Sequence, residues 1–537
     1  MAGEYVTAEA QVGGTTPDVV MSKKSVWRVL RENPYVFGLS AFASLGGLLF
    51  GYDQGVVSGV MTMESFAATF PRIAIDSTFK GWFVSTLLLF AWFGSLVNGP
   101  VADWLGRKGS MQLAVVIFIL GAAFQTAASE VPLLFAGRAI AGLAVGMLTM
   151  IVPMYISELS VPEIRGTLVV LQQLSITLGI LVSYWLEYGT QYIGGTRCAP
   201  DIAYTGGTPE LPTFDPRYDV GPDGCTGQSS ASWRVPFGLQ IFPALVLGIG
   251  MVFFPESPRF YLMRHKEDKA LAALAKVRGL HPDTDSLRAE YLGIKAEVLF
   301  DETLNRERFP SKKGLSLFIA QHQALLGLSG KTSGLLATGV YGIVNTLSTL
   351  PALFLIDKVG RRPLLMCGAA GTFISLVIVG GIIGGFGESL RTNKSAGWAG
   401  IAFIYIYDIN FSYSFAPIGW VLPSEIFNLG NRSKAMAITT SATWMCNFII
   451  GLITPDMLEK IGYGTYLFFA AFCLLAFVMT YFFVPETRGK SLEEMDLVFG
   501  DTAAHEEKTR LLEIAASMGL TDVLSDEKLG TEVKHEG

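Results

Sequence analysis

The chain has 537 residues, of which 50% are hydrophobic and 16% are charged, and its mean hydropathy is +0.43. Because average soluble domains carry about 25% charged residues, this composition excludes an ordinary soluble enzyme and indicates a membrane protein. The formal net charge of -6 excludes the basic surface that nucleic-acid binding needs, so we expect no nucleic-acid partner.

Residues 1–35 form a polar segment that precedes the first apolar run and carries Lys23, Lys24, Arg28 and Arg31. This pattern is unlike a cleavable signal peptide, in which the apolar region follows a short basic start. We therefore expect a cytoplasmic N-terminal tail and a first span that acts as its own insertion signal.

Apolar stretches long enough to cross a hydrocarbon core of roughly 30 Å as helices follow this tail. They lie at 36–59, 80–100, 110–128, 132–156, 167–188, 232–255, 333–356, 364–386, 397–424, 434–457 and 463–485. The sequence therefore predicts an all-α membrane protein with eleven clear spans, placed in a lipid bilayer as a monomer.

A charged stretch at 256–314, with helix-like runs such as EDKALAALAKVRG, separates the sixth span from the seventh. Basic residues follow alternate spans, and the positive-inside rule places those loops in the cytoplasm. We expect a six-helix half at 36–255, a cytoplasmic helical linker at 256–314, a second half at 315–485 and a cytoplasmic tail at 486–537.

The two halves carry the same polar motifs in the same order, for example ADWLGRKG in the first half and IDKVGRRP in the second. The repeated acidic and basic residues are Asp103, Arg107, Glu158, Arg165 and Glu256, followed by Asp357, Arg361, Glu425, Arg432 and Glu486. Two parallel halves joined by a linker are typical of a transporter whose site lies at the midplane between them.

These repeated charges have two interpretations. They can form a cytoplasmic gate, an ion-pair layer that locks the inner side when the cavity faces outward and separates when the halves rock. Alternatively, they only set the topology and solvate the helix ends. The recurrence of the complete set in both halves favours the gate.

Several longer motifs point to one family: GYDQGVVSG, GRAIAG, PMYISEL, PESPR, GIVNT, PIGWVLPSEIF and PETRGKSLEE. Together they resemble the sugar porter family of the major facilitator superfamily, from about residue 36 to 496, with fungal monosaccharide carriers nearest in style. The resemblance implies two pseudo-symmetric halves with nominally twelve helices, alternating access, and either proton symport or passive uniport of a sugar.

Asp53 is a carboxylate inside an apolar run, and it lies about six residues from the outer end of its span, as Arg138 does in the fourth span. At a rise of about 1.5 Å per residue, both lie at a similar depth. The protonation of Asp53 then depends on how close Arg138 stays and how wet the cavity is, which suits a proton carrier. The alternative is a permanent structural ion pair. The resemblance favours symport, because proton-coupled members of the family have Asp after Gly-Tyr.

A sugar offers hydroxyls and an apolar ring face, so its site needs neutral amides and an aromatic side chain. The intramembrane residues that meet this description are Phe50, Gln172, Gln173, Asn345, Trp420 and Asn447. By resemblance, Gln173, Asn345 and Trp420 fall on sugar-contacting positions and Phe50 on a lining position of the family. The alternative for each amide is a hydrogen bond between helices.

Other classes of function remain open. A passive carrier of sugars, polyols or quinate-like acids and a transport-silent sugar sensor would share this core. The five His residues form no metal-ligand spacing and no catalytic constellation is visible, so we expect neither an enzyme nor a cofactor beyond the coupling proton.

One polar loop holds Cys198 and Cys225, which pair as a disulfide or remain two free thiols. Of the sequons, only Asn393 falls in an outward loop, where it is a candidate glycan site.

The span count exposes a gap, because the chain must cross outward between 256 and 332 and only LSLFIAQHQALLGL, residues 315–328, is available. Its 14 residues are fewer than the roughly 17 that a span needs. Members of the family carry a full seventh helix here, with sugar-contacting amides. We therefore hypothesise an incomplete sugar site and little or no transport, as in a splice or gene-model variant. The alternative is a short, strained crossing with local membrane thinning.

Overall fold

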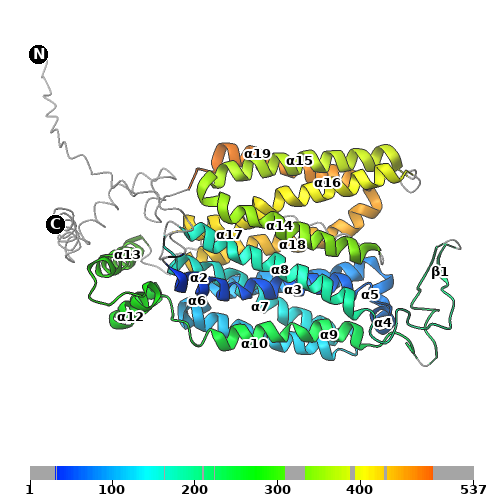
Figure 1. Cartoon of the computed structure of the whole chain (residues 1–537), viewed down its shortest axis with the longest axis horizontal. Coiled ribbons are helices and arrows are strands. Elements are labelled where there is room, and N and C mark those ends of the chain that lie inside the picture. The colour runs from blue at the N-terminus through cyan, green and yellow to red at the C-terminus, as the bar shows by residue number, and fades with distance from the viewer. Residues whose placement is uncertain are drawn as a thin grey trace, which may run out of the picture.

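The computed structural model describes Arg31 and residues 33–487, apart from 162–163, 209–210, 223, 309–332, 388–392 and 428–431. Within these residues, long helices run side by side along one axis (Figure 1). The predicted short crossing at 315–328 lies outside the described residues.

The first half is built from α2 (Pro34–Ala43), α3 (Leu45–Val60), α6 (Ser77–Ala127), α7 (Val131–Leu159), α8 (Arg165–Thr190), α9 (Ala231–Leu239) and α10 (Ile241–Gly250). The long α6 contains two predicted spans, which meet where Gly106 adopts a φ of 88° and breaks the helical path. A turn at Ser44 separates α2 from α3, which together match the first predicted span.

The second half is built from α14 (Ser333–Val359), α15 (Arg361–Phe386), α16 (Lys394–Tyr413), α17 (Phe415–Ile426), α18 (Arg432–Ile461) and α19 (Gly464–Phe483). Non-helical torsions at Ser414 separate α16 from α17 within one predicted span. Among the described residues, nine helices are long and apolar enough to cross a membrane. Since α6 covers two predicted spans and the α16–α17 pair covers another, all eleven predicted spans coincide with helices.

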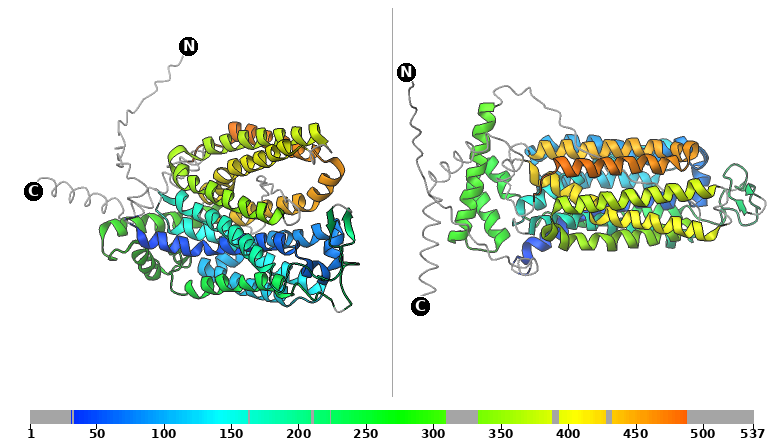
Figure 2. Two further views of the ribbon diagram at one scale, coloured as in Figure 1. Left: turned by 45° about the vertical axis from the view of Figure 1, so that its right-hand side comes forward. Right: turned by 90° about the horizontal axis from the view of Figure 1, so that it is seen from above.

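The two halves lie against each other along their length (Figure 2, left). At their boundary α6 packs against α18, and α8 packs against α14. One continuous apolar core crosses this boundary and includes Leu148 of the first half with Trp420 and Trp444 of the second. The described residues therefore form one packed body of two halves.

Small residues allow the closest helix contacts. A Cβ on Gly51 of α3 would overlap the backbone carbonyl of Ile176 in α8, and one on Gly146 of α7 would overlap that of Ala91 in α6. Since association between helices in lipid depends on close packing, glycine at these positions lets the backbones approach.

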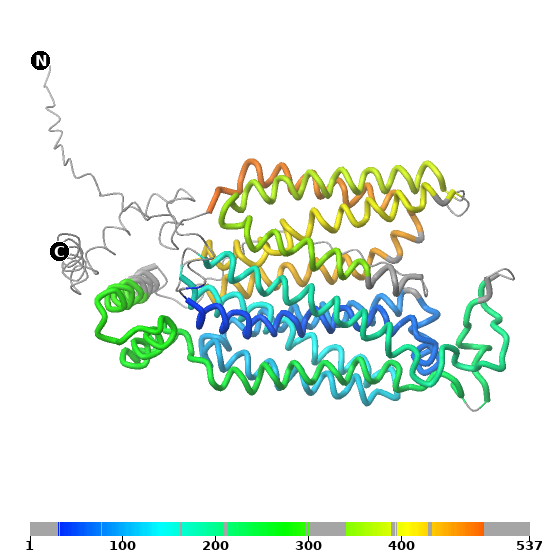
Figure 3. Tube along the Cα trace, viewed as in Figure 1, coloured from blue at the N-terminus to red at the C-terminus, as the bar shows by residue number. Residues whose placement is uncertain are grey.

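Short helices and a hairpin occupy the two ends of the bundle (Figure 2, right; Figure 3). At one end, the linker end, α11 (Pro258–Met263), α12 (Glu267–Arg278) and α13 (Asp285–Arg308) share a small core of their own. At the opposite end, the hairpin end, lie α4 (Glu64–Thr69), α5 (Pro71–Ile75) and an antiparallel pair, β1 (Gly206–Thr208) and β2 (Leu211–Thr213). The hairpin is a small β addition to the predicted all-α fold.

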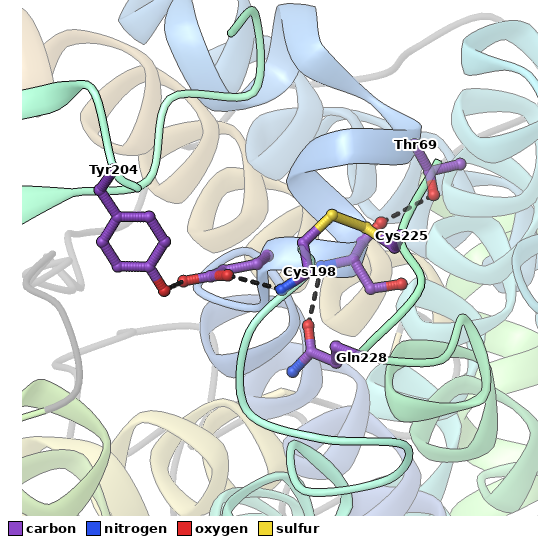
Figure 4. The surroundings of a disulfide bond; sticks show 7 residues. Thr69, Cys198, Tyr204, Cys225 and Gln228 are labelled. Carbon is purple, nitrogen blue, oxygen red and sulfur yellow. Dashed lines mark hydrogen bonds between the residues drawn. A yellow bond between two sulfur atoms is a disulfide. The ribbon is translucent and has the colours of Figure 1, made fainter. Parts of the chain in front are cut away.

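A disulfide between Cys198 and Cys225 closes the loop that carries the hairpin (Figure 4). Glu64 of α4 holds this loop, because its carboxylate accepts from the Cys198 N–H over 2.8 Å and from the Tyr204 hydroxyl. Gln228 accepts from the Ser65 N–H over 2.8 Å. Of the two alternatives for these cysteines, the structure has the disulfide, and the loop is fastened to the helices below it.

Candidate functional site

Asp53 and Arg138 form a buried ion pair between α3 and α7. Arg138 Nη1 lies 3.0 Å from Asp53 Oδ2, and their side chains are 2% and 0% exposed. The Phe83 ring lies 5.7 Å from the Arg138 guanidinium carbon and adds an aromatic face to the pair. The two predicted partners are thus adjacent, at the similar depth that their positions in the spans predict.

Gln173 and Trp420 meet across the boundary between the halves. Trp420 Nε1, on α17, donates to Gln173 Oε1, on α8, over 2.9 Å, and both side chains are buried. The neighbouring Gln172 lies against α3 of the first half, since a Cβ added at Gly47 would lie 3.1 Å from Gln172 Cγ. The structure therefore places Gln173 at the boundary with the second half and Gln172 inside the first half.

Phe50 reaches the same boundary through an aromatic contact. Its ring centroid lies 5.0 Å from that of Trp444 in α18, edge to face. Trp444 Nε1 in turn donates to Thr149 Oγ1 of α7 over 3.1 Å. Trp444 and Thr149 were not among the predicted site residues, since neither an indole nor a lone hydroxyl in an apolar span stands out in sequence.

Asn345 lies beside a second buried carboxylate that the sequence analysis did not single out. Asn345 Nδ2, on α14, donates to Asp408 Oδ1, on α16, over 3.0 Å. Asp408 is a charged residue inside an apolar span, the signal that identified Asp53, and the same criterion would have found it. Asn447 of α18 is buried, but none of the described residues donates a hydrogen bond to its Oδ1.

The repeated charges of the first half converge at the linker end. Arg107 Nη2 lies 2.8 Å from Glu158 Oε1, with both side chains almost fully buried. Glu256 accepts from the backbone N–H groups of Arg107 and Lys108, over 3.1 and 3.0 Å. Burial raises the pKa of the Glu256 carboxyl, although the Ser257 N–H and the Arg107 charge oppose that shift.

The second half repeats this arrangement residue by residue. Arg361 Nη2 lies 2.6 Å from Glu425 Oε1, and Glu486 accepts from the backbone N–H groups of Arg361 and Arg362 over 3.0 and 3.1 Å. Gly106 and Gly360, which precede the two arginines, have φ of 88° and 109°. The sequence repeat is therefore a repeat of structure.

The halves differ in the contacts of their first acidic residue, Asp103 or Asp357. Asp357 pairs with Arg361 over 2.9 Å and also accepts from the Thr167 N–H and hydroxyl, over 2.9 and 2.7 Å, across the boundary. Asp103 of the first half has no ion pair within 4.0 Å among the described residues. The short ion pairs of the predicted gate thus lie within each half, and Asp357 with Thr167 bridges the halves.

The remaining members of the predicted gate lie near the opposite half. Arg165 begins α8, and its positive charge attracts the Glu425 carboxylate of the second half. Arg432 begins α18, and its charge acts on Glu158 of the first half. Each arginine therefore attracts a carboxylate of the opposite half.

The family model described as "Sugar (and other) transporter" matches residues 39–499. The chain belongs to this sugar transporter family. It is therefore a multi-pass membrane transporter with the major facilitator fold rather than an enzyme, as the sequence predicts.

Relatives of known name agree with this membership. The transporter is 31% identical over 503 residues to the MFS glucose transporter mfs1 of Aspergillus flavus, covering 86% of this chain and 89% of that protein. It is 32% identical to a probable quinate permease of Aspergillus niger, covering 86% of this chain and 88% of that protein.

Solved structures agree as well. The proton:xylose symporter XylE of E. coli, bound to 6-bromo-6-deoxy-D-glucose, matches with a TM-score of 0.67 and 26% identity. The match covers 87% of this transporter and 99% of the XylE chain.

Proposed function

We propose that this transporter imports a monosaccharide, with a hexose as the first candidate, together with protons by alternating access. The buried Asp53–Arg138 pair is the observation that carries the proposal. A carboxylate that loses its contact with a cation becomes easier to protonate in a desolvated site, so breaking the pair would couple proton binding to the state of the carrier.

The side chains at the boundary between the halves support a sugar as the substrate. Gln173 and Asn345 supply neutral amides, Trp420 supplies an indole with a polar N–H, and Phe50 supplies an apolar ring. Such a set can pair with hydroxyls and cover an apolar ring face. Roles for Gln172 and Asn447 in substrate binding remain part of the proposal.

In the proposed orientation the linker end faces the cytoplasm and the hairpin end lies outside the plasma membrane, and both chain termini are proposed to be cytoplasmic. Arg107 lies at the break in α6, and Arg165, Arg361 and Arg432 begin α8, α15 and α18 at the linker end, which agrees with the positive-inside rule. A disulfide at the opposite end fits an oxidising exterior.

One proton would suffice for concentration of a neutral solute. A membrane potential of about 100 mV supplies about 2.3 kcal/mol per charge. Each pH unit adds roughly 1.4 kcal/mol. Together these terms would support accumulation of about several hundredfold.

A second candidate is a carrier of quinate-like acids, which the named permease relative favours. Uptake of a panel of labelled sugars and quinate in a transporter-deficient cell, with the external pH recorded, separates the candidates. Proton symport predicts sugar accumulation with external alkalinisation. Sugar uptake without a pH change would support a passive carrier, and uptake of quinate alone would replace the proposal.

A further inference from the structure

The amide of Asn345 has both of its donors engaged by protein groups. Asn345 Nδ2 contacts Asp408 Oδ1 over 3.0 Å and the Tyr341 hydroxyl over 3.4 Å. A carboxylate can only accept, so Asp408 holds the NH2 group toward itself and sets the direction of the whole amide. Asp408 is 2% exposed and Asn345 7%, so water does not compete freely for these bonds.

The carbonyl oxygen of the same amide remains available. Asn345 Oδ1 is buried and accepts no hydrogen bond from the residues that the structure describes. An unpaired buried acceptor costs about 1 to 3 kcal/mol, which a donating ligand group would recover. At Asn345 the site therefore presents a ligand with a hydrogen-bond acceptor and no hydrogen-bond donor.

Asn345 also lies on the side of α14 that meets the first half. A Cβ on Gly342, one turn before Asn345, would lie 3.2 Å from Leu181 Cα and 3.4 Å from Tyr184 Cδ2, both on α8. Since residues three apart share a helix face, Asn345 faces the boundary that also holds Gln173. Asp408 contacts it from α16, a neighbouring helix of the second half.

We propose that Asp408 is a positioning residue for substrate selection, which fixes Asn345 as an obligate acceptor and so requires a donating hydroxyl on the substrate. This inference rests on the proposed sugar site. A carboxylate or a fluorine has no proton to donate, so the position rejects both. The position therefore selects substrates that present a hydroxyl to it, as a neutral sugar can.

The test uses the purified full chain and measures dissociation constants for D-glucose, each monodeoxyfluoro-D-glucose and quinate. In the wild type, fluorine at one ring position should weaken binding about tenfold or more, as loss of a required hydrogen bond predicts. In Asp408→Asn the Asn345 amide can rotate and donate, so that single penalty should shrink to about threefold or less.

Two further variants separate positioning from general damage. The double variant Asp408→Asn with Asn345→Asp exchanges the two groups, so that position 345 carries a carboxylate held by the amide NH2 at position 408. Position 345 can then only accept, and the loss of affinity on fluorination should return. Asn345→Ser replaces the amide by a hydroxyl that both donates and accepts, so it should lose the penalty even if Asp408→Asn fails to fold. Asp456→Asn is the matched control, because this half-exposed carboxylate lies near the end of α18, 3.9 Å from Lys460.

The outcomes are distinct. If the wild type binds D-glucose but Asp408→Asn and Asn345→Ser keep the wild-type fluorine pattern, the role of Asp408 is wrong while the sugar site stands. If the wild type binds quinate and none of the sugars, the proposed function fails and this inference fails with it.

Discussion

Trp420 donates its indole N–H to the side-chain oxygen of Gln173 over 2.9 Å, and this single bond links α17 of the second half to α8 of the first. Both residues resemble sugar-contacting positions of the family, yet here they contact each other. A sugar bound between the halves would exchange this bond for bonds to its own hydroxyls, so the pair is positioned to respond to substrate.

Gln173→Ala should weaken sugar binding by about tenfold, since it removes a bond to a desolvated hydroxyl worth on the order of 1 to 3 kcal/mol. Gln172→Ala is the matched comparison, because Gln172 faces α3 inside the first half, and it should change affinity less. Equilibrium binding to the purified protein measures both. Equal losses in the two variants would contradict the distinction that the structure makes.

Asp53→Asn should abolish uphill accumulation and leave some downhill exchange, because an amide cannot carry the proton yet fills the same space beside Arg138. Proteoliposomes with an imposed pH gradient measure accumulation, and the same vesicles with equal pH measure exchange. Uphill uptake at the wild-type level in this variant would show that the coupling proton binds elsewhere.

Gly106→Ala should lower the apparent Tm more than Gly279→Ala does. Gly279 has left-handed torsions (φ 66°, ψ 27°), which cost an alanine roughly 1 to 2 kcal/mol, whereas Gly106 (φ 88°, ψ 173°) lies in a region that essentially only glycine adopts. At Gly106 the added methyl group would also overlap the Glu256 carboxylate, whereas nothing lies within 4 Å of the one at Gly279. Thermal unfolding in detergent measures the difference, and equal shifts would contradict both the backbone strain and the overlap with Glu256 at Gly106.

Alkylation of the denatured protein should modify three cysteines without reductant and five after reduction, because Cys198 and Cys225 are paired and Cys367, Cys446 and Cys473 are free. Intact mass gives the count. The Cys198→Ser and Cys225→Ser double variant should become more sensitive to protease in the loop, since hydrogen bonds such as those to Glu64 and Ser65 would then hold it without the covalent link. Five modified cysteines before reduction would disprove the disulfide.

The chain as written should transport more slowly than a version in which a family-type seventh helix replaces residues 315–328, since 14 residues are fewer than the roughly 17 that a span needs. Uptake of the same sugar by both proteins, normalised to surface expression, measures the difference. Equal rates would support the alternative of a short, strained crossing.

Much of the fold follows from local properties. Hydropathy alone locates the helices that coincide with the eleven predicted spans, because each span must be apolar over its own length. The repeated motifs likewise predict the paired networks around Arg107 and Arg361, since equal spacing on equivalent helices produces equal geometry. The hairpin of β1 and β2 escaped prediction because strands this short carry no recognisable period.

The arrangement of the candidate site depended on tertiary structure more than the positions of the spans did. The sequence by itself determined the span positions, the family and the residue types suited to a sugar and a proton. Only the packed helices decided that Gln173 rather than Gln172 faces the second half, because adjacent residues point about 100° apart and helix rotation is set by neighbours. Only they brought Asp408 to Asn345, residues 63 positions apart on different helices. Such a contact depends on how the helices pack around each other, which no single stretch of sequence encodes.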